Sequence, residues 1–135
     1  MDQSYRDFLT ELESNNELIQ IDQAVDKKFE VASFLGLFDD GPAVRFNNVS
    51  GTDFPVVGNM LNSRARIAQA IGCSTKQITE KITEATVSGQ EPIVVTDAPC
   101  QDFVRLASEG ELLEALPIPY FFEKDSGPYI SAGLI

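Results

Sequence analysis

Apolar side chains repeat at helical spacing in the first third of the chain. Tyr5, Phe8, Leu9 and Leu12 follow the i, i+3, i+4, i+7 pattern that is typical of one buried helix face. Ser4 precedes this stripe and can cap the helix. The same spacing predicts a second helix, which must end at the Gly-Pro pair of residues 41–42; its apolar positions are Val31, Phe34, Leu35 and Phe38.

Two more helices are predicted between residues 62 and 89. The first is capped by Asn62 or Ser63 and closes at Gly72. Ser74 and Gln77 have the spacing of a capping box, which predicts that a further helix begins there and ends near residues 88–89. A last short helix is predicted over residues 111–116.

Short apolar runs between these helices predict strands. The expected strands cover residues 17–22, 43–46, 54–58 and 92–96, with a further short candidate at 103–104. Helices and strands alternate irregularly and without a fixed repeat. We therefore expect a single domain over residues 1–135, of the α/β or α+β class, with a small mixed sheet flanked by amphipathic helices.

Residues 130–135 end the chain on an apolar run that resembles the opening of a strand. Chain ends are usually solvated and loosely held. We therefore expect a truncated C-terminal strand, and a chain that is one piece of a larger protein. An unpaired strand at this position would offer an edge for self-association through residues 130–135.

The charge of the chain excludes several functions. The formal net charge is −11, which repels nucleic-acid backbones and anionic membranes, so neither is an expected partner. No apolar run approaches the roughly 18 residues of a membrane span, and the first residues lack the basic and apolar regions of a signal peptide. We expect a cytoplasmic protein.

The chain has no histidine, which removes Ser–His and Cys–His nucleophile pairs and HExxH zinc sites. Cys73 and Cys100 are far apart and are too few for a structural zinc site. A cytosolic disulfide is not expected either, so both thiols should be reduced. Taken residue by residue, the chain predicts no catalytic residue and no metal ligand.

Four other features admit both a functional and a structural interpretation. Arg64 and Arg66 could bind an anion, but a solvated helix face is the better interpretation. Glu123 and Asp125, with Lys124 between them, could act as an acid–base pair, although their spacing carries little specificity. Gly127-Pro128 fits a tight turn better than a ligand contact.

The fourth feature is a Pro-rich segment with three aromatic residues, residues 117–122. Its two prolines keep the chain extended, and the aromatic side chains offer a large apolar surface. The segment could wrap a partner or cross the core, and the sequence favours neither.

Several stretches of the chain together resemble the family of UbiD-like decarboxylases. Residues 117–130 (PIPYFFEKDSGPYI) are similar to the family's P-x-P…D-x-G-P-Y-I-T-A-G segment. The other matching stretches follow in family order: 5–9 (YRDFL), 16–19 (NELI), 41–49 (GPAVRFNNV), 56–60 (VVGNM) and 63–68 (SRARIA). The resemblance therefore spans almost the whole chain.

This resemblance implies the N-terminal domain of a larger enzyme. Family members decarboxylate aromatic or α,β-unsaturated acids reversibly, using prenylated FMN with Mn²⁺ and K⁺. Their Glu-Arg-Glu network, metal ligands and most phosphate contacts would lie beyond Ile135, so the chain alone is expected to be inactive and to bind no cofactor. Its expected partner is the flavin-binding remainder of the enzyme. Tyr129 and Ser131, where Ser131 stands in place of the family's usual Thr, are the candidate cofactor-side residues.

Two alternatives stay open. The chain could be a natural non-catalytic subunit of a split decarboxylase, in which another chain supplies the flavin domain. It could also be an unrelated interaction domain that binds a partner through residues 120–122. The apolar ending at Leu134 and Ile135 argues against this second alternative.

Overall fold

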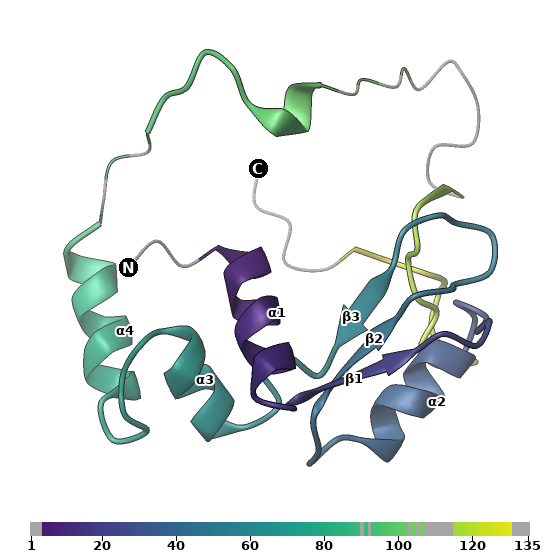
Figure 1. The fold of residues 1–135 in the computed structure, drawn as a ribbon, viewed down its shortest axis with the longest axis horizontal. Helices are drawn as coiled ribbons and strands as arrows, with labels where there is room; N and C mark the ends of the chain where they lie inside the picture. The colour runs from purple at the N-terminus through teal and green to yellow at the C-terminus, as the bar shows by residue number, and fades with distance from the viewer. Residues whose placement is uncertain are drawn as a thin grey trace.

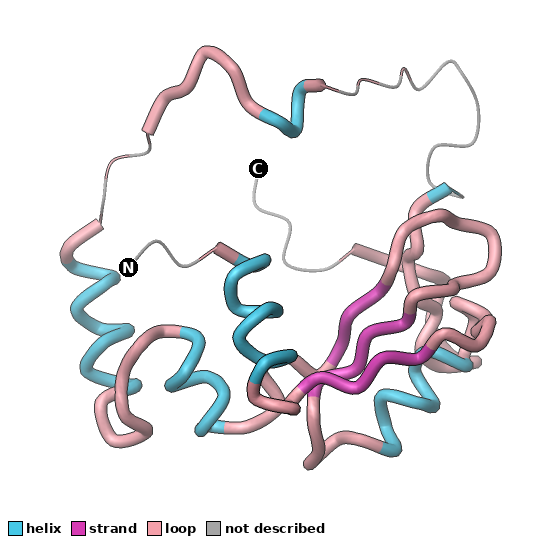
Figure 2. Tube along the Cα trace, in the orientation of Figure 1, coloured by secondary structure: helices cyan, strands magenta, loops and turns pink. Residues whose placement is uncertain are grey.

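A computed structural model describes residues 4–89, 91, 93–102, 104, 106 and 115–130. Figures 1 and 2 show helices, a small sheet and one long connecting segment. The elements are α1 (Tyr5–Ser14), β1 (Leu18–Ile21), α2 (Glu30–Leu37), β2 (Ala43–Phe46), β3 (Val56–Gly58), α3 (Arg64–Ala70), α4 (Ile78–Val87) and the 3₁₀ turn η1 (Pro99–Gln101). The predicted α/β fold is confirmed.

The three strands form a mixed sheet in the order β1-β2-β3. β1 and β2 are parallel and are joined through α2, with Leu18 opposite Ala43 and Ile21 opposite Phe46. β2 and β3 are antiparallel, with Val44 opposite Gly58. The predicted strands at residues 17–22, 43–46 and 54–58 are therefore confirmed to within two residues at each end.

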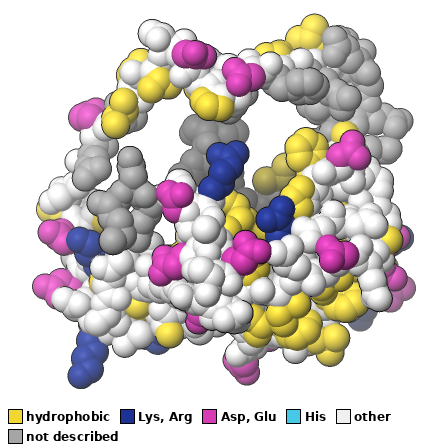
Figure 3. Space-filling model, in the orientation of Figure 1, with side chains coloured by type: hydrophobic (Ala, Val, Ile, Leu, Met, Phe, Trp, Pro, Cys, Tyr) yellow, Lys and Arg dark blue, Asp and Glu magenta, His cyan; other side chains and the backbone are white. Residues whose placement is uncertain are grey.

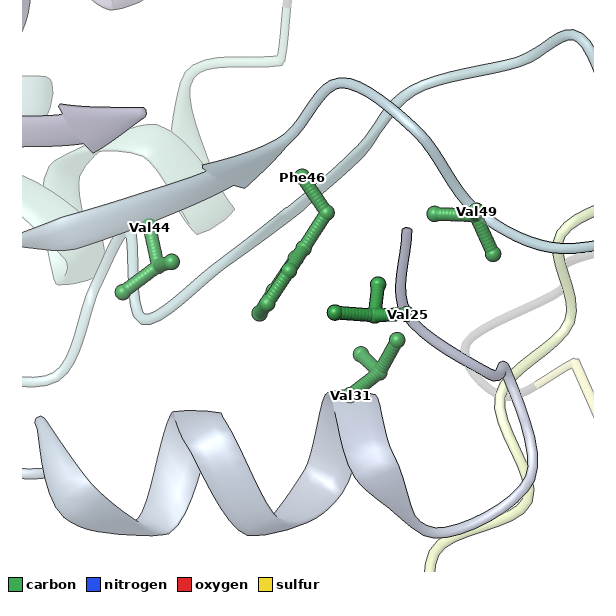
Figure 4. Packing of buried hydrophobic residues seen from close by; sticks show 5 residues of the cluster. All are labelled: Val25, Val31, Val44, Phe46 and Val49. Atoms are coloured by element: carbon green, nitrogen blue, oxygen red, sulfur yellow. The ribbon is translucent and has the colours of Figure 1, made fainter. Parts of the chain in front are cut away.

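The main hydrophobic core lies between α2 and the sheet (Figure 4). Its fully or almost fully buried members come from β2, α2 and the loops at residues 25 and 49: Val25, Val31, Val44, Phe46 and Val49. Phe34 of α2 meets the Phe46 ring edge-on, with 6.1 Å between the ring centroids. Because side chains alternate along a strand, Val44 and Phe46 enter this core while Arg45 belongs to the opposite sheet face.

α2 lies very close to β3 at Gly58. A Cβ atom added at this position would collide with the side chain of Leu35. Gly58 therefore lets the helix approach the sheet closely, which is a packing role rather than a conformational one.

The predicted serine caps at Ser4 and Ser63 are confirmed, whereas Ser74 is not the N-cap residue of α4. The Ser4 hydroxyl oxygen accepts a hydrogen bond from the Asp7 backbone N–H at 3.1 Å, and the Ser63 hydroxyl oxygen accepts one from the Arg66 N–H at 3.2 Å. The Gln77 amide oxygen accepts from the Ser74 N–H at 3.2 Å, as expected for the returning half of a capping box. α4 itself begins at Ile78.

The predicted strand over residues 92–96 is wrong. Residues 93–96 are not in a strand, and the side chains of Ile93 and Val94 are 90% and 91% exposed. The described parts of residues 91–106 arch away from the sheet (Figure 1), so this apolar run has no neighbouring strand to pair with. The predicted elements at 103–104, 111–116 and 130–135 lie mainly outside the described residues.

Candidate functional site

Residues 115–130 return to the core and are held there by the backbone of residues 27–29. The Tyr120 N–H donates to the Lys27 carbonyl oxygen at 2.9 Å, and the Phe29 N–H donates to the Tyr120 carbonyl oxygen at 2.9 Å. Lys28 and Tyr120 thereby form an isolated parallel β-bridge. Phe29, the N-cap residue of α2, has a positive φ of 73°, which is unusual for a bulky residue. The bridge and the helix start therefore share one strained residue.

The Tyr120 side chain strengthens this attachment. Its ring lies 5.0 Å from the Phe29 ring, centroid to centroid, and the Lys28 ammonium lies 5.4 Å and 5.8 Å from the two ring centroids. The Tyr120 hydroxyl donates to the Asp125 carbonyl oxygen at 2.8 Å. We call this group of residues 27–29 with Tyr120 the tyrosine latch.

Two side chains hold the Pro-rich segment just before the latch. The Lys27 ammonium donates to the Leu116 carbonyl oxygen at 3.3 Å, and the Thr52 hydroxyl donates to the Ala115 carbonyl oxygen at 2.8 Å. Residues 115–120 are all half-buried. Of the two interpretations of residues 117–122, the structure therefore favours a segment packed on the core up to Tyr120, while Phe121 and Phe122 are exposed.

Asp125 has a structural role in the turn that follows. Its carboxylate accepts from the Phe122 N–H at 3.1 Å, and its own N–H donates to the Phe122 carbonyl oxygen at 3.0 Å. Glu123 and Lys124 are exposed. The acid–base interpretation of Glu123 and Asp125 gains no support, since Asp125 is engaged by backbone.

The turn continues through Gly127, whose φ is +143°. A side chain is disfavoured at this φ, which agrees with the tight-turn interpretation of Gly127-Pro128. Tyr129 comes next and is 62% exposed, and no hydrogen bond of its hydroxyl is seen within the described part of the chain. The other candidate cofactor-side residue, Ser131, lies outside the described residues. The structure thus presents Tyr129 at the end of an anchored segment.

Arg66 is a residue whose role the sequence did not reveal. It is only 8% exposed, so the solvated-face interpretation is wrong for Arg66, although it holds for Arg64. The Arg66 guanidinium donates to the Asn59 carbonyl oxygen at 2.9 Å and to the Asn62 side-chain oxygen at 2.7 Å. It also donates to the Gly41 carbonyl oxygen at 3.3 Å.

The two asparagines complete this network at the end of α2. The Asn59 amide donates to the carbonyl oxygens of Leu35 and Phe38 at 2.8 Å and 3.0 Å. The Asn62 amide donates to the Gly41 carbonyl oxygen at 3.1 Å. These donors satisfy carbonyl groups that a helix C-terminus leaves unpaired. Asn62 and Arg66 are spaced i, i+4, which was the available signal for the pair.

The described residues contain no cluster of three or more His, Cys, Asp or Glu side chains that could hold a metal ion. None of the helices in the described ranges is long and apolar enough to cross a bilayer. The geometry is that of a packed α/β unit that presents an anchored, partly aromatic segment at residues 115–130.

Comparison with protein families identifies this unit. Residues 9–86 match the model of the 3-octaprenyl-4-hydroxybenzoate carboxy-lyase N-terminal domain, known as UbiD_N. The chain therefore belongs to the UbiD family, as the sequence resemblance predicted.

Curated relatives extend the match over almost the whole chain. The anhydromevalonate phosphate decarboxylase of Methanosarcina mazei is 38% identical over 132 residues, which are 98% of this chain and 29% of that protein. The enzyme of the same name from Methanothermobacter thermautotrophicus is 31% identical over 130 residues, 96% of this chain and 29% of its own length. The chain thus spans less than a third of these relatives.

Solved structures show the same fold. An evolved dimeric form of the UbiD-class enzyme HmfF from Pelotomaculum thermopropionicum, in complex with prFMN, superposes with a TM-score of 0.87 at 29% identity, over 96% of this chain and 30% of that one. The vanillic acid decarboxylase ShVdcCD of Sedimentibacter hydroxybenzoicus, in open form with truncated ShVdcD, gives a TM-score of 0.76 at 27% identity, over 95% and 30% of the two chains.

Proposed function

We propose that this chain acts as the N-terminal domain of a decarboxylase that uses prenylated FMN to decarboxylate aromatic or α,β-unsaturated acids reversibly. The observation that carries the proposal is the similarity over 96% of the chain to an enzyme in complex with prFMN. The names of the curated relatives, both decarboxylases, support the same reaction class. Which acid is the substrate depends on groups outside the described residues.

The described residues do not fit a self-contained flavin or metal site. They include no group of metal-ligating side chains, and the chain has no Gly-rich phosphate loop. Prenylated FMN, Mn²⁺ and K⁺ would therefore be held by the flavin-binding remainder of the enzyme, where the flavin supplies the site at which the acid is activated. This chain would pack against that remainder and form one wall of the active site, and alone it would be inactive.

Tyr129 and Ser131 are the residues proposed to face the cofactor. Tyr129 is exposed directly after a segment that the tyrosine latch and the Asp125 turn fix to the core. Such an arrangement positions an exposed side chain while leaving it open to a partner. Ile130, the next residue in the chain, is exposed as well.

Flavin absorbance tests the proposal. The 135-residue chain is mixed with prenylated FMN and Mn²⁺, alone and together with a separately produced flavin-binding part of a UbiD-class enzyme, and bound flavin and released CO₂ are measured. We expect neither from the chain alone. CO₂ release by the chain without the flavin-binding part would refute the proposal that this chain is inactive alone.

A second candidate is a natural non-catalytic subunit of a split decarboxylase. The observation in its favour is that the similar enzyme ShVdcCD is named with a component ShVdcD, and that this chain covers only 30% of the matching chain. Gel filtration with the flavin-binding chain distinguishes the two, because only a natural subunit should form a stable stoichiometric complex without covalent linkage.

We also propose that the chain self-associates through residues 130–135. It rests on the apolar character of this ending and on the exposure of Ile130. Light scattering compares the chain with a shortened form that ends at Ser126. Dimers that disappear on shortening would support the proposal, and dimers that persist would contradict it.

A further inference from the structure

A hollow of about 570 Å³ lies between α1 and the sheet, on the sheet face opposite α2. This volume is in the range of small-molecule sites. Its apolar lining includes Leu9 of α1, Leu18 of β1 and Val57 of β3. Its charged lining among the described residues consists of Arg6, Glu13 and Arg45.

Arg45 lies at the floor of this hollow for a topological reason. It is the middle residue of the central strand, with Gln20 and Val57 as its cross-strand partners, while its neighbours Val44 and Phe46 enter the core on the other face. The Nε atom of Arg45 is buried and has no hydrogen-bond partner. The Nε atom of Arg66 is unpaired in the same way, and what sets Arg45 apart is that its side chain lines a hollow.

Arg6 brings a second guanidinium to the same hollow. Within the described part of the chain, the one ion pair joins Lys81 and Glu84, so neither Arg6 nor Arg45 has a carboxylate partner there. Glu13 is held differently, because its Oε1 accepts a hydrogen bond from the Gln20 amide at 2.5 Å.

Among the described residues, the lining therefore carries two positive charges against one negative charge, in a chain whose net charge is −11. Figure 3 shows basic side chains near the middle of this face, where α1 adjoins the sheet, with acidic side chains around them. A local excess of positive charge favours the binding of an anion.

We propose that this hollow binds a small carboxylic acid with an apolar body. The carboxylate lies between the guanidinium groups of Arg6 and Arg45, each of which can donate a charge-assisted hydrogen bond to it. The apolar body lies against Leu9, Leu18 and Val57. This site goes beyond the proposed function, since it needs neither the flavin nor turnover and is formed wholly by this chain.

Binding is tested by titrating the ¹⁵N-labelled 135-residue chain with hexanoate and benzoate, and following the amide shifts by NMR. We expect saturable shifts in residues 5–13 and around residues 45 and 57. Hexanamide is the neutral control and should cause none. Shifts without saturation, or shifts equal to those of hexanamide, would each overturn the proposal.

Arginine variants locate the site. Arg6→Gln should weaken benzoate binding on the order of tenfold, because a charge-assisted hydrogen bond is lost. Arg64→Gln removes the same charge from α3 outside the hollow and should leave the dissociation constant unchanged. Since Arg6 is exposed, its variant should fold normally. Unchanged binding in Arg6→Gln, or equal loss in Arg64→Gln, would refute the site.

Arg45→Gln gives a second measurement. It should weaken binding at least as much as Arg6→Gln, since Arg45 is half-buried and its charge is less screened by water than that of the exposed Arg6. Its fold is checked by circular dichroism. If this variant does not fold, the Arg6→Lys variant decides: retention of most of the binding supports a charge interaction, and loss equal to that of Arg6→Gln overturns the carboxylate assignment.

Discussion

Residues 43–46 and residues 93–96 are two four-residue stretches that the sequence predicts to lie in strands, and only the first of them does. Residues 43–46 form the central strand, and Ala43, Val44 and Phe46 are fully buried. Residues 93–96 form no strand, and Ile93 and Val94 are almost fully exposed. Both runs are rich in β-branched or aromatic side chains, so propensity does not separate them. The difference is that β2 has a strand on each side and a helix across one face.

Of the substitutions that test this comparison, the one at Phe46 should have the largest effect on the free energy of unfolding. Phe46→Ala leaves a cavity among Val31, Val44 and the Phe34 ring, and should lower the free energy of unfolding by about 3–5 kcal/mol. Urea denaturation followed by circular dichroism measures it. A loss below about 1 kcal/mol would mean that the α2–sheet core is not the main source of stability.

A second prediction concerns Arg66 and asks whether the stable unit extends beyond the sheet. Arg66→Met keeps the apolar stem but removes the donors to Asn59, Asn62 and Gly41, and should cost about 2–3 kcal/mol in the same experiment. Arg64→Met is the matched control on the exposed side of α3 and should change stability by less than about 0.5 kcal/mol. Equal effects of the two variants would contradict the buried network.

The tyrosine latch should give a smaller effect. Tyr120→Phe keeps the ring on Phe29 but removes the hydroxyl that donates to Asp125, at a cost of about 1 kcal/mol. Limited proteolysis should then cut faster between residues 121 and 127. Unchanged cleavage would show that the hydroxyl does not hold the Asp125 turn.

The smallest effect on stability is expected in residues 93–96. Val94→Ala should change the free energy of unfolding by less than about 0.5 kcal/mol, because the side chain is 91% exposed. Val44→Ala is the matched substitution in the core and should cost considerably more. A large loss for Val94→Ala would show that the side chains of residues 93–96 are buried in solution.

Local signals in the sequence were sufficient for most of the fold. The helix stripes at residues 5–12 and 31–38, the serine caps and the three short strands all depend on neighbours within one or two turns, and the structure confirms them. The strand expected at 92–96 failed because pairing depends on a distant partner that no local pattern reveals.

The site residues were harder to predict for the same reason. In the sequence alone, Arg66 resembles an exposed helical arginine, because its partner Gly41 is distant in the chain. The unpaired Nε of Arg45 likewise becomes apparent only when the position of α1 relative to the sheet is known. Tyr129 and Ser131 were chosen from the family resemblance, which gives no information about their contacts. Tyr129 lies exposed, and whether it faces the flavin stays a prediction.

The tyrosine latch also has a consequence for how the protein forms during synthesis. The parallel pairing of β1 and β2 closes over a short stretch of chain, whereas the Lys27–Leu116 contact spans 89 positions. Long loops close at a greater entropic cost, so the latch should come late. While a ribosome is still adding residues 90–119, Phe29 lacks its Tyr120 partner. The start of α2 thus reaches its final geometry only after most of the chain has been translated.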